Sequence, residues 1–229
     1  MTEEIARAYF PQMFNSPDMA SAKSIILCGE PSGSITTEER WEKETPYLVE
    51  ECGKNLNIRS DTWVIDYGCG IGRMAKGLID KYGCHVIGVD FSGPMRDLAP
   101  KYVESDNFVV WSPETLGRMI ERGVRVDCAI AIWVIQHIFY PSEALKLING
   151  AMKPEALFYT LNSTRAVPTE RVEDKACKEF IDDGVSVEHE ICKVFQEKER
   201  RFGLPAGVAS PELSGISVTQ ILGKKMGYL

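Results

Sequence analysis

Three glycines and two aspartates in the first half of the chain have the spacing of a ligand-binding loop. Asp66 ends an apolar run, Gly68, Gly70 and Gly72 follow at alternate positions, and Asp90 comes 24 residues after Asp66. Glycine is needed where the backbone takes positive φ or where a ligand must approach the main chain. Because free N–H groups follow at the start of the next helix, such a loop suits a nucleotide or a ligand carboxylate.

The spacing of this loop differs from the G-x-G-x-x-G fingerprint of nicotinamide dinucleotide enzymes. Arg73 occupies the place of the third fingerprint glycine, and the pattern is D-x-G-x-G-x-G. Asp90 ends the next predicted strand, where a carboxylate can accept both hydroxyls of an adenosine ribose. The sequence therefore disfavours a nicotinamide oxidoreductase and makes Asp90 a candidate for binding a ribose.

The elements that must position these residues alternate between β-branched runs and helical patterns. Strands are predicted over residues 63–67, 85–90, 108–111, 127–133, 156–160 and 216–222, and helices over 74–82, 92–102, 113–122, 142–152 and 186–202. This alternation indicates βαβ units, and hence a doubly wound, mostly parallel α/β sheet with helices on both faces. Ligands of such sheets bind beyond the carboxyl ends of the strands.

The 229 residues suit a single α/β domain, within which we expect three parts. Residues 1–60 are expected to form an N-terminal helical cap, residues 61–160 the cofactor-binding core, and residues 161–229 a helical, substrate-side insertion with a final strand. Thr36 and Glu39 have the spacing of a capping box. Both flanks are rich in large apolar side chains, so we expect both to close over the carboxyl edge, the N-terminal one being the more mobile.

Charge balance and cysteine usage narrow the class of protein. The chain has 26 Lys and Arg against 33 Asp and Glu, a net charge of −7, which disfavours a broad nucleic-acid or anionic-membrane surface. No apolar run reaches the ~18–20 residues that span a bilayer, and the acidic start lacks a signal-peptide pattern, so we expect a cytoplasmic protein. Seven cysteines without a Cys-x-x-Cys pair predict reduced thiols and no metal site.

Residues 63–153 resemble the core of class I S-adenosylmethionine-dependent methyltransferases, which have a Rossmann-like fold. Five landmarks carry the resemblance, in this order: Asp66-x-Gly68-x-Gly70-x-Gly72, Gly88-Val-Asp90-Phe-Ser92, Ser112-Pro-Glu114, Asp127 with Gln136-His137 after its strand, and Met152-Lys-Pro154. The resemblance implies S-adenosyl-L-methionine as the methyl donor and S-adenosyl-L-homocysteine as the product.

The resemblance also implies cofactor contacts. The three glycines would lie against the methionine portion, Asp66 would hold the loop and the cofactor's amino group, and Asp90 would bind the ribose hydroxyls. The residues expected to border the adenine or the sulfonium are Phe91, Ser92, Met95, Ser112, Glu114, Ile132 and Trp133, of which Phe91, Met95 and Trp133 could equally be core residues. Ser112 stands where the family has an acid, and Glu114 follows two residues later.

Methyl transfer from a sulfonium is a direct displacement, so the protein mainly supplies orientation and exclusion of water. A base is needed only when the acceptor must lose a proton. His137 is the candidate for that base, and the alternative is that it holds a loop in place. Residues expected to contact the acceptor are Gln136, Tyr140, Asn162 and Arg165.

Two missing motifs narrow the acceptor. Neither the Asn/Asp-Pro-Pro-Tyr/Phe run of amino-group methylases nor the Pro-Cys of cytosine-C5 enzymes follows the fourth predicted strand. Together with the acidic composition, their absence favours a small-molecule acceptor over nucleic acid. The alternatives are a protein or tRNA methyltransferase, a non-methylating adenosyl-cofactor enzyme such as an aminopropyl transferase, and a binding module without catalysis.

Overall fold

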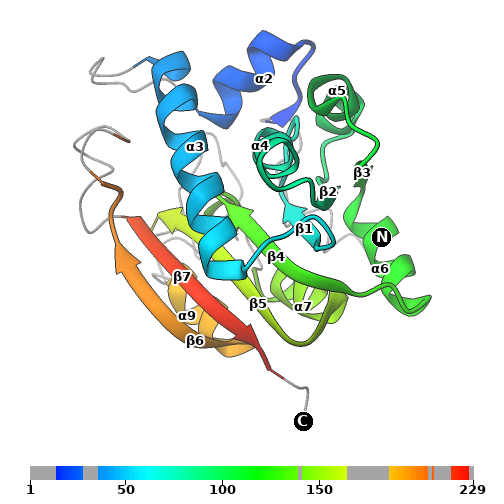
Figure 1. The fold of residues 1–229 in the computed structure, drawn as a ribbon, viewed down its shortest axis with the longest axis vertical. Helices are drawn as coiled ribbons and strands as arrows, with labels where there is room; N and C mark the ends of the chain where they lie inside the picture. The colour runs from blue at the N-terminus through cyan, green and yellow to red at the C-terminus, as the bar shows by residue number, and fades with distance from the viewer. Residues whose placement is uncertain are drawn as a thin grey trace, which may run out of the picture.

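A computed structural model describes residues 14–27, 36–138, 141–163, 186–205, 208 and 218–226. Its strands form one sheet in the order β3-β2-β1-β4-β5-β7-β6 (Figure 1). The strands are β1 Trp63–Tyr67, β2 His85–Val89, β3 Phe108–Trp111, β4 Val126–Ile132, β5 Met152–Ser163, β6 Phe195–Phe202 and β7 Val218–Lys225. The helices are α2 Met19–Ile26, α3 Thr37–Leu56, α4 Arg73–Tyr82, α5 Gly93–Val103, α6 Pro113–Glu121, α7 Pro141–Ala151 and α9 Val187–Val194, with a 3₁₀ turn, η2, at Ile135–His137.

The sheet is mostly parallel, as predicted. Strands β1 to β5 pair in parallel, whereas β7 runs antiparallel to β5 and β6 antiparallel to β7. Strands β2 and β3 are added on one side of β1, and β4 is added on the other side. The strand order therefore reverses between β1 and β4. The carboxyl ends of β1, β2, β4 and β5 therefore meet at one edge, beside the reversal where such sheets bind ligands.

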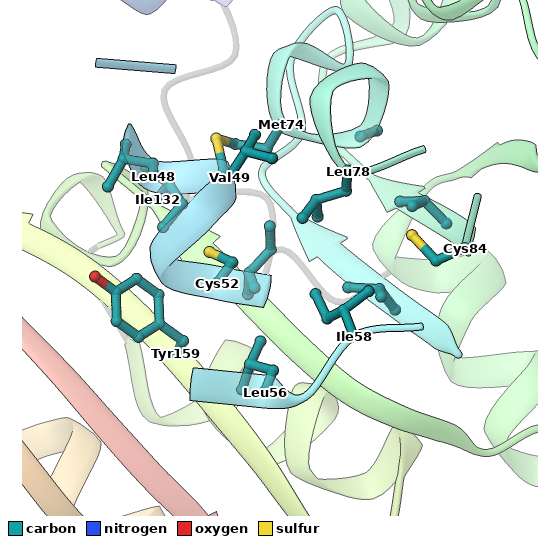
Figure 2. Packing of buried hydrophobic residues seen from close by; sticks show 14 of the residues in the cluster. Leu48, Val49, Cys52, Leu56, Ile58, Met74, Leu78, Cys84, Ile132 and Tyr159 are labelled. Carbon is teal, nitrogen blue, oxygen red and sulfur yellow. The ribbon is translucent and has the colours of Figure 1, made fainter. Parts of the chain in front are cut away.

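Helices cover both faces of the sheet, and alternate strand residues divide between them. Val64 lies in the apolar cluster beneath α3 and α4, whereas Ile65 lies in the cluster formed with α6, α7 and α9. Figure 2 shows the first cluster, in which Cys52 of α3 lies above the sheet close to Tyr159 and Ile132. The predicted two-faced cover is confirmed.

The helix starts near the carboxyl edge follow the sequence signals. In the capping box of α3, Thr36 Oγ1 accepts from Glu39 N at 3.1 Å, and Glu39 Oε2 accepts from Thr36 N at 2.9 Å. Ser92 and Ser112 cap α5 and α6, each helix having a proline in its first turn. These caps fix where the loops after β2 and β3 end.

The helix predicted over residues 186–202 is wrong in its second half. Helix α9 ends at Val194, and Phe195–Phe202 instead forms β6, which pairs with β7. Phe195 is 1% exposed, and its ring stacks on Phe158 with centroids 4.5 Å apart. Pairing with β7 satisfies the backbone hydrogen bonds of β6 and outweighs the helix propensity of its charged residues. Most of these charged side chains remain exposed, as is usual in an edge strand.

The same segment does not close over the carboxyl edge as expected. Helix α9 packs on α7, where Asn149 Nδ2 donates to Val194 O at 3.2 Å, and β6 extends the sheet. Residues 186–202 therefore cover the α7 face and lengthen the sheet. The rest of this flank, from residue 164 to 185, lies outside the described residues.

The expectations about membrane spans, metal sites and cysteines can be compared with the described residues only. No helix in these ranges is long and apolar enough to cross a membrane. The same ranges contain no group of three or more side chains placed to hold a metal ion. The free cysteines among them are Cys52, Cys69, Cys84, Cys128 and Cys192, whereas Cys28 and Cys177 lie outside the described residues.

Candidate functional site

The glycine loop joins the end of β1 to the start of α4. Gly68, Gly70 and Gly72 have φ values of +74°, +54° and +87°, in the left-handed region that strains residues with a Cβ. A Cβ on Gly70 would also lie 2.7 Å from Cδ1 of Ile26, the last residue of α2. Glycine is thus required here by the backbone itself, and α2 lies directly against the loop.

Asp90, at the end of β2, holds the loop from the side. Its Oδ2 accepts from Gly70 N at 2.8 Å and its Oδ1 from Ser92 N at 2.9 Å. Burial raises the pKa of Asp90 although the N–H groups of Ser92 and Gly70 oppose that change. A carboxylate has about four acceptor positions, so these two donors leave capacity for ligand hydroxyls.

Asp66 is buried one residue before the end of β1, between Gly88 of β2 and Ile130 of β4. Among the described residues its Oδ2 has no hydrogen-bond partner. Burial raises the pKa of Asp66 to about 7, against the opposing effects of the Ala75 N–H and the Arg73 guanidinium. An unpartnered buried carboxylate oxygen is costly, so this atom marks a place where a ligand donor fits.

A buried ionic cluster that sequence reasoning missed lies beside the loop. Glu44 of α3 is 0% exposed and accepts from Arg40 Nε at 2.8 Å and Arg73 Nη2 at 3.1 Å. Arg40, Glu44 and Arg73 form what we call the guanidinium cluster. In the sequence its one signal is the (i, i+4) spacing of Arg40 and Glu44 within an apolar helix face.

The guanidinium cluster contains two positive charges and one negative charge. Burial alone raises the pKa of Glu44, but the guanidiniums of Arg73 and Arg40 outweigh burial and hold that pKa below its ordinary value. Both arginines are also buried, at 7% and 4% exposed for Arg40 and Arg73. The excess positive charge beside the glycine loop therefore suits an anionic ligand group.

Trp133, the residue after β4, connects this cluster to the sheet edge. Its indole Nε1 donates to Glu44 at 2.7 Å, and the Arg40 guanidinium lies over its ring at 5.3 Å. Its φ of +60° is an outlier for a bulky residue, a strain of the kind that collects at functional sites. Ile132 before it is buried in the α3-side cluster.

Residues 14–27, which we call the N-terminal cover, lie across the loops after β1, β2 and β4. Ser92 Oγ donates to Phe14 O at 3.0 Å. The Phe14 ring is edge-on to Phe91 at 6.0 Å and to His137 at 5.7 Å. An apolar cluster joins α2 to the helices below it; its buried members are Ala22, Leu27, Trp41, Ile71 and Met95. The N-terminal flank therefore reaches the carboxyl edge, as expected, and Met95 lies in its contact with the core.

The side chains after β3 face the same edge. Ser112 Oγ accepts from Thr115 N at 3.2 Å and so caps α6. Burial by itself raises the pKa of Glu114, but the Ser112 hydroxyl and the Arg96 guanidinium lower it further than burial raises it. Glu114 is therefore ionised near neutral pH and half-buried, so it can accept a hydrogen bond.

Three of the residues predicted to lie near the acceptor, Gln136, His137 and Asn162, come together at η2. His137 Nε2 lies 3.2 Å from Gln136 Nε2, and its Nδ1 has no partner among the described residues. Burial lowers the pKa of His137 to about 4, so its imidazole is neutral at pH 7. Asn162, at the end of β5, is 2% exposed and bonds to the backbone of η2. Tyr140 and Arg165 lie outside the described residues.

Comparisons with known proteins agree with this geometry. Residues 36–199 match a family model described as a methyltransferase domain. A ubiquinone biosynthesis O-methyltransferase from Rickettsia bellii is 27% identical over 121 residues, which are 52% of this chain and 50% of that protein. The chain thus spans about half the length of the curated relatives that it matches.

Solved structures share the fold at low sequence identity. The CurJ carbon methyltransferase has a TM-score of 0.60 at 10% identity, over 95% of this chain and 61% of that one. A Haemonchus contortus phosphoethanolamine N-methyltransferase, solved with phosphomonomethylethanolamine and S-adenosylhomocysteine, has a TM-score of 0.55 at 16% identity, over 79% and 53% of the two chains. With the family model matching more than half of the sequence, the chain belongs to the class I S-adenosylmethionine-dependent methyltransferase family.

Proposed function

We propose that this protein transfers a methyl group from S-adenosylmethionine to a small-molecule acceptor by direct displacement. The observation that carries the proposal is the pair of buried aspartates beside Gly70. Asp90 already binds the loop through Gly70 N and keeps capacity for further donors, while Asp66 has an unpartnered oxygen at the same edge. These are the positions that a ligand with a ribose and an ammonium group would satisfy.

The residues present fit the three polar parts of the cofactor. Asp90 would accept from the ribose hydroxyls, and Asp66 from the ammonium group. The excess positive charge of the guanidinium cluster would balance the methionine carboxylate, which the loop N–H groups can also bind. Trp133, held against Glu44, would border the sulfonium, and Phe91 and Glu114 the adenine.

When bound, the cofactor supplies a methyl group already activated on a sulfonium. The chain then has to hold the acceptor in line and exclude water. The N-terminal cover is placed to exclude water, since Phe14 contacts both Phe91 and His137. A histidine with a pKa of about 4 is a weak base, because general bases work best with a pKa near the operating pH. His137 is therefore better suited to orienting an acceptor oxygen.

A small acceptor is supported by two separate observations. The net charge of −7 disfavours a nucleic acid, which would have to be bound through its phosphates. The curated relatives are named ubiquinone biosynthesis O-methyltransferases, so their names indicate a hydroxyl group on a small molecule. We therefore place the acceptor of this chain in the class of small hydroxyl compounds.

Calorimetry with S-adenosylhomocysteine, S-adenosylmethionine and NAD tests the cofactor proposal. Both adenosyl ligands should bind, and NAD should not. Asp90→Ala should weaken binding of S-adenosylhomocysteine by ~1.5–3 kcal/mol, which is roughly 10- to 150-fold. Asp127→Ala is the matched control, because Asp127 accepts from Trp63 N and Lys153 at the opposite edge of the sheet. Tight NAD binding without any response to the adenosyl ligands would refute the proposal.

A further inference from the structure

The turn that carries His137 lacks a capping side chain of its own. η2 starts after Val134, which makes no side-chain cap hydrogen bond. Asn162, 27 residues later in the sequence, supplies the missing acceptor: its Oδ1 accepts from Ile135 N at 3.0 Å. Both groups are buried, so this bond would be expensive to break.

The Asn162 amide has one consistent orientation. Thr160 Oγ1 donates its proton to Ala131 O at 2.7 Å, and its lone pairs accept from Asn162 Nδ2 at 2.6 Å. A flipped amide would place an NH₂ group against the Ile135 N–H and an oxygen against Thr160. The chain of hydrogen bonds from β4 through Thr160 to Asn162 therefore fixes the oxygen that receives the η2 backbone.

The position of η2 determines which nitrogen of His137 is available. Gln136 Nε2 lies 3.2 Å from His137 Nε2, so an amide N–H donated there leaves the single proton of the neutral imidazole on Nδ1. Nδ1 is the buried atom without a partner among the described residues. The turn thus holds a buried Nδ1–H that has no acceptor among the described residues, on an imidazole whose ring lies against the Phe14 ring of the N-terminal cover.

We infer that Asn162 is a positioning residue, which holds η2 so that His137 presents Nδ1–H to an oxygen of the methyl acceptor. The contact with a methyl acceptor rests on the proposed function, whereas the link from Asn162 to His137 does not depend on it. Asn162 touches no reacting atom in this account. Its Oδ1 accepts from Ile135 N and its Nδ2 donates to Thr160 Oγ1, and because both bonds hold the η2 turn to β5 we give Asn162 this role in place of the direct acceptor contact expected from the sequence.

Nitrogen-15 NMR of histidine-labelled protein tests the inference, since the chain has only three histidines. His85→Asn and His189→Asn assign the remaining signal. In the full chain, His137 should be the Nδ1–H tautomer between pH 5.5 and 8. Asn162→Ala should mix the two tautomers and raise the His137 titration midpoint from about 4 toward the ordinary 6.5, as the turn loosens and admits water.

The matched control is Asn149→Ala. Asn149 is also a buried amide that donates to a backbone carbonyl, but it lies between α7 and α9, away from η2. It should destabilise the fold and leave the His137 signal unchanged. If Asn162→Ala does not fold, Thr160→Val, which frees the amide to rotate, should give a smaller change in the same direction.

Two results would overturn the inference: an unchanged His137 signal in the folded Asn162→Ala or Thr160→Val protein, or an equal change in Asn149→Ala. Calorimetry with S-adenosylhomocysteine on the same samples keeps the proposed function separate. Asn162→Ala should bind it within about threefold of the wild type, because Asn162 is not among the cofactor residues. A wild type that fails to bind would refute the proposed function, whereas the His137 signals would still decide the role of Asn162.

Discussion

Asp66 and Asp90 are chemically identical residues whose neighbours give them different tasks. Asp90 receives two backbone N–H groups and so keeps part of the hydrogen bonding that its charge requires. Asp66 is also buried and has one oxygen without a partner among the described residues. Because its pKa is about 7, Asp66 is half-protonated near neutral pH. A ligand ammonium group would stabilise the ionised form.

Asp66 should therefore make the stability of the protein depend on pH. Its pKa rises from 3.8 in the unfolded chain to about 7 in the folded one. Between these values the folded state binds more protons than the unfolded state, so stability falls as pH rises. Relative to Asp66→Asn, the wild type should lose about 2–3 kcal/mol between pH 5 and pH 8. Urea unfolding of both proteins at the two pH values measures this, and a constant difference would contradict it.

The loop residues could be predicted from the sequence because their signal is local. Glycine is itself the signal of a positive φ, which Gly68, Gly70 and Gly72 have. Asp66 and Asp90 could be predicted because each stands at the end of a recognisable strand. Glu44 could not be predicted in this way. Its partners Arg73 and Trp133 lie 29 and 89 residues away, and only the packing of α3 beside α4 and β4 brings them together.

At the scale of elements, α3 is joined to the site by charge as well as by apolar packing. Its lower turns bury Leu48 and Cys52 in the cluster against the sheet (Figure 2). A turn nearer its start carries Glu44, which pairs with Arg73 at the end of the glycine loop. Because Arg73 is the first residue of α4, the Glu44–Arg73 pair ties α3 to the end of that loop. The helix thus has a structural half and a half that belongs to the site.

Glu44→Gln should destabilise the protein by about 3–5 kcal/mol, because it leaves two buried guanidiniums without their counter-charge. Glu50→Gln on the same helix is the control, since Glu50 is half exposed and pairs with Lys54 at the surface. Its unfolding midpoint should match that of the wild type. Denaturant unfolding compares the two variants; equal stability of Glu44→Gln and Glu50→Gln would show that the cluster contributes nothing.

The elements also show where sequence patterns stop being informative. Val187, Ile191 and Val194 repeat at helical spacing, and the helix that they predict exists. Phe195 continues that spacing but enters the core as the first residue of β6. The helix ends here because residues 195–202 pair with the backbone of β7. Since β7 lies far along the sequence, no local pattern could have predicted this pairing.

At the scale of the whole molecule, the two flanks do different things. The C-terminal flank adds β7 and β6 to the sheet and places α9 beside α7 on the face opposite α3 (Figure 1). The N-terminal cover instead lies across the carboxyl edge, over loops that come from three different strands. Its apolar cluster is the smallest of the three, so we expect the cover to open more easily than the elements that pack in the other two clusters.

This arrangement predicts how hydrogen exchange should change when S-adenosylhomocysteine binds. The cover touches the loop that we expect the ligand to bind, because Ile26 Cδ1 would lie 2.7 Å from a Cβ on Gly70. Ligand that fills the space beneath should hold the cover closed, so protection should rise in residues 14–27 and 36–47 as well as in 68–72. Helix α9, Val187–Val194, serves as an internal control, since it packs beside α7 on the far face and should not respond. Protection confined to residues 68–72 would instead make the cover a permanent part of the core.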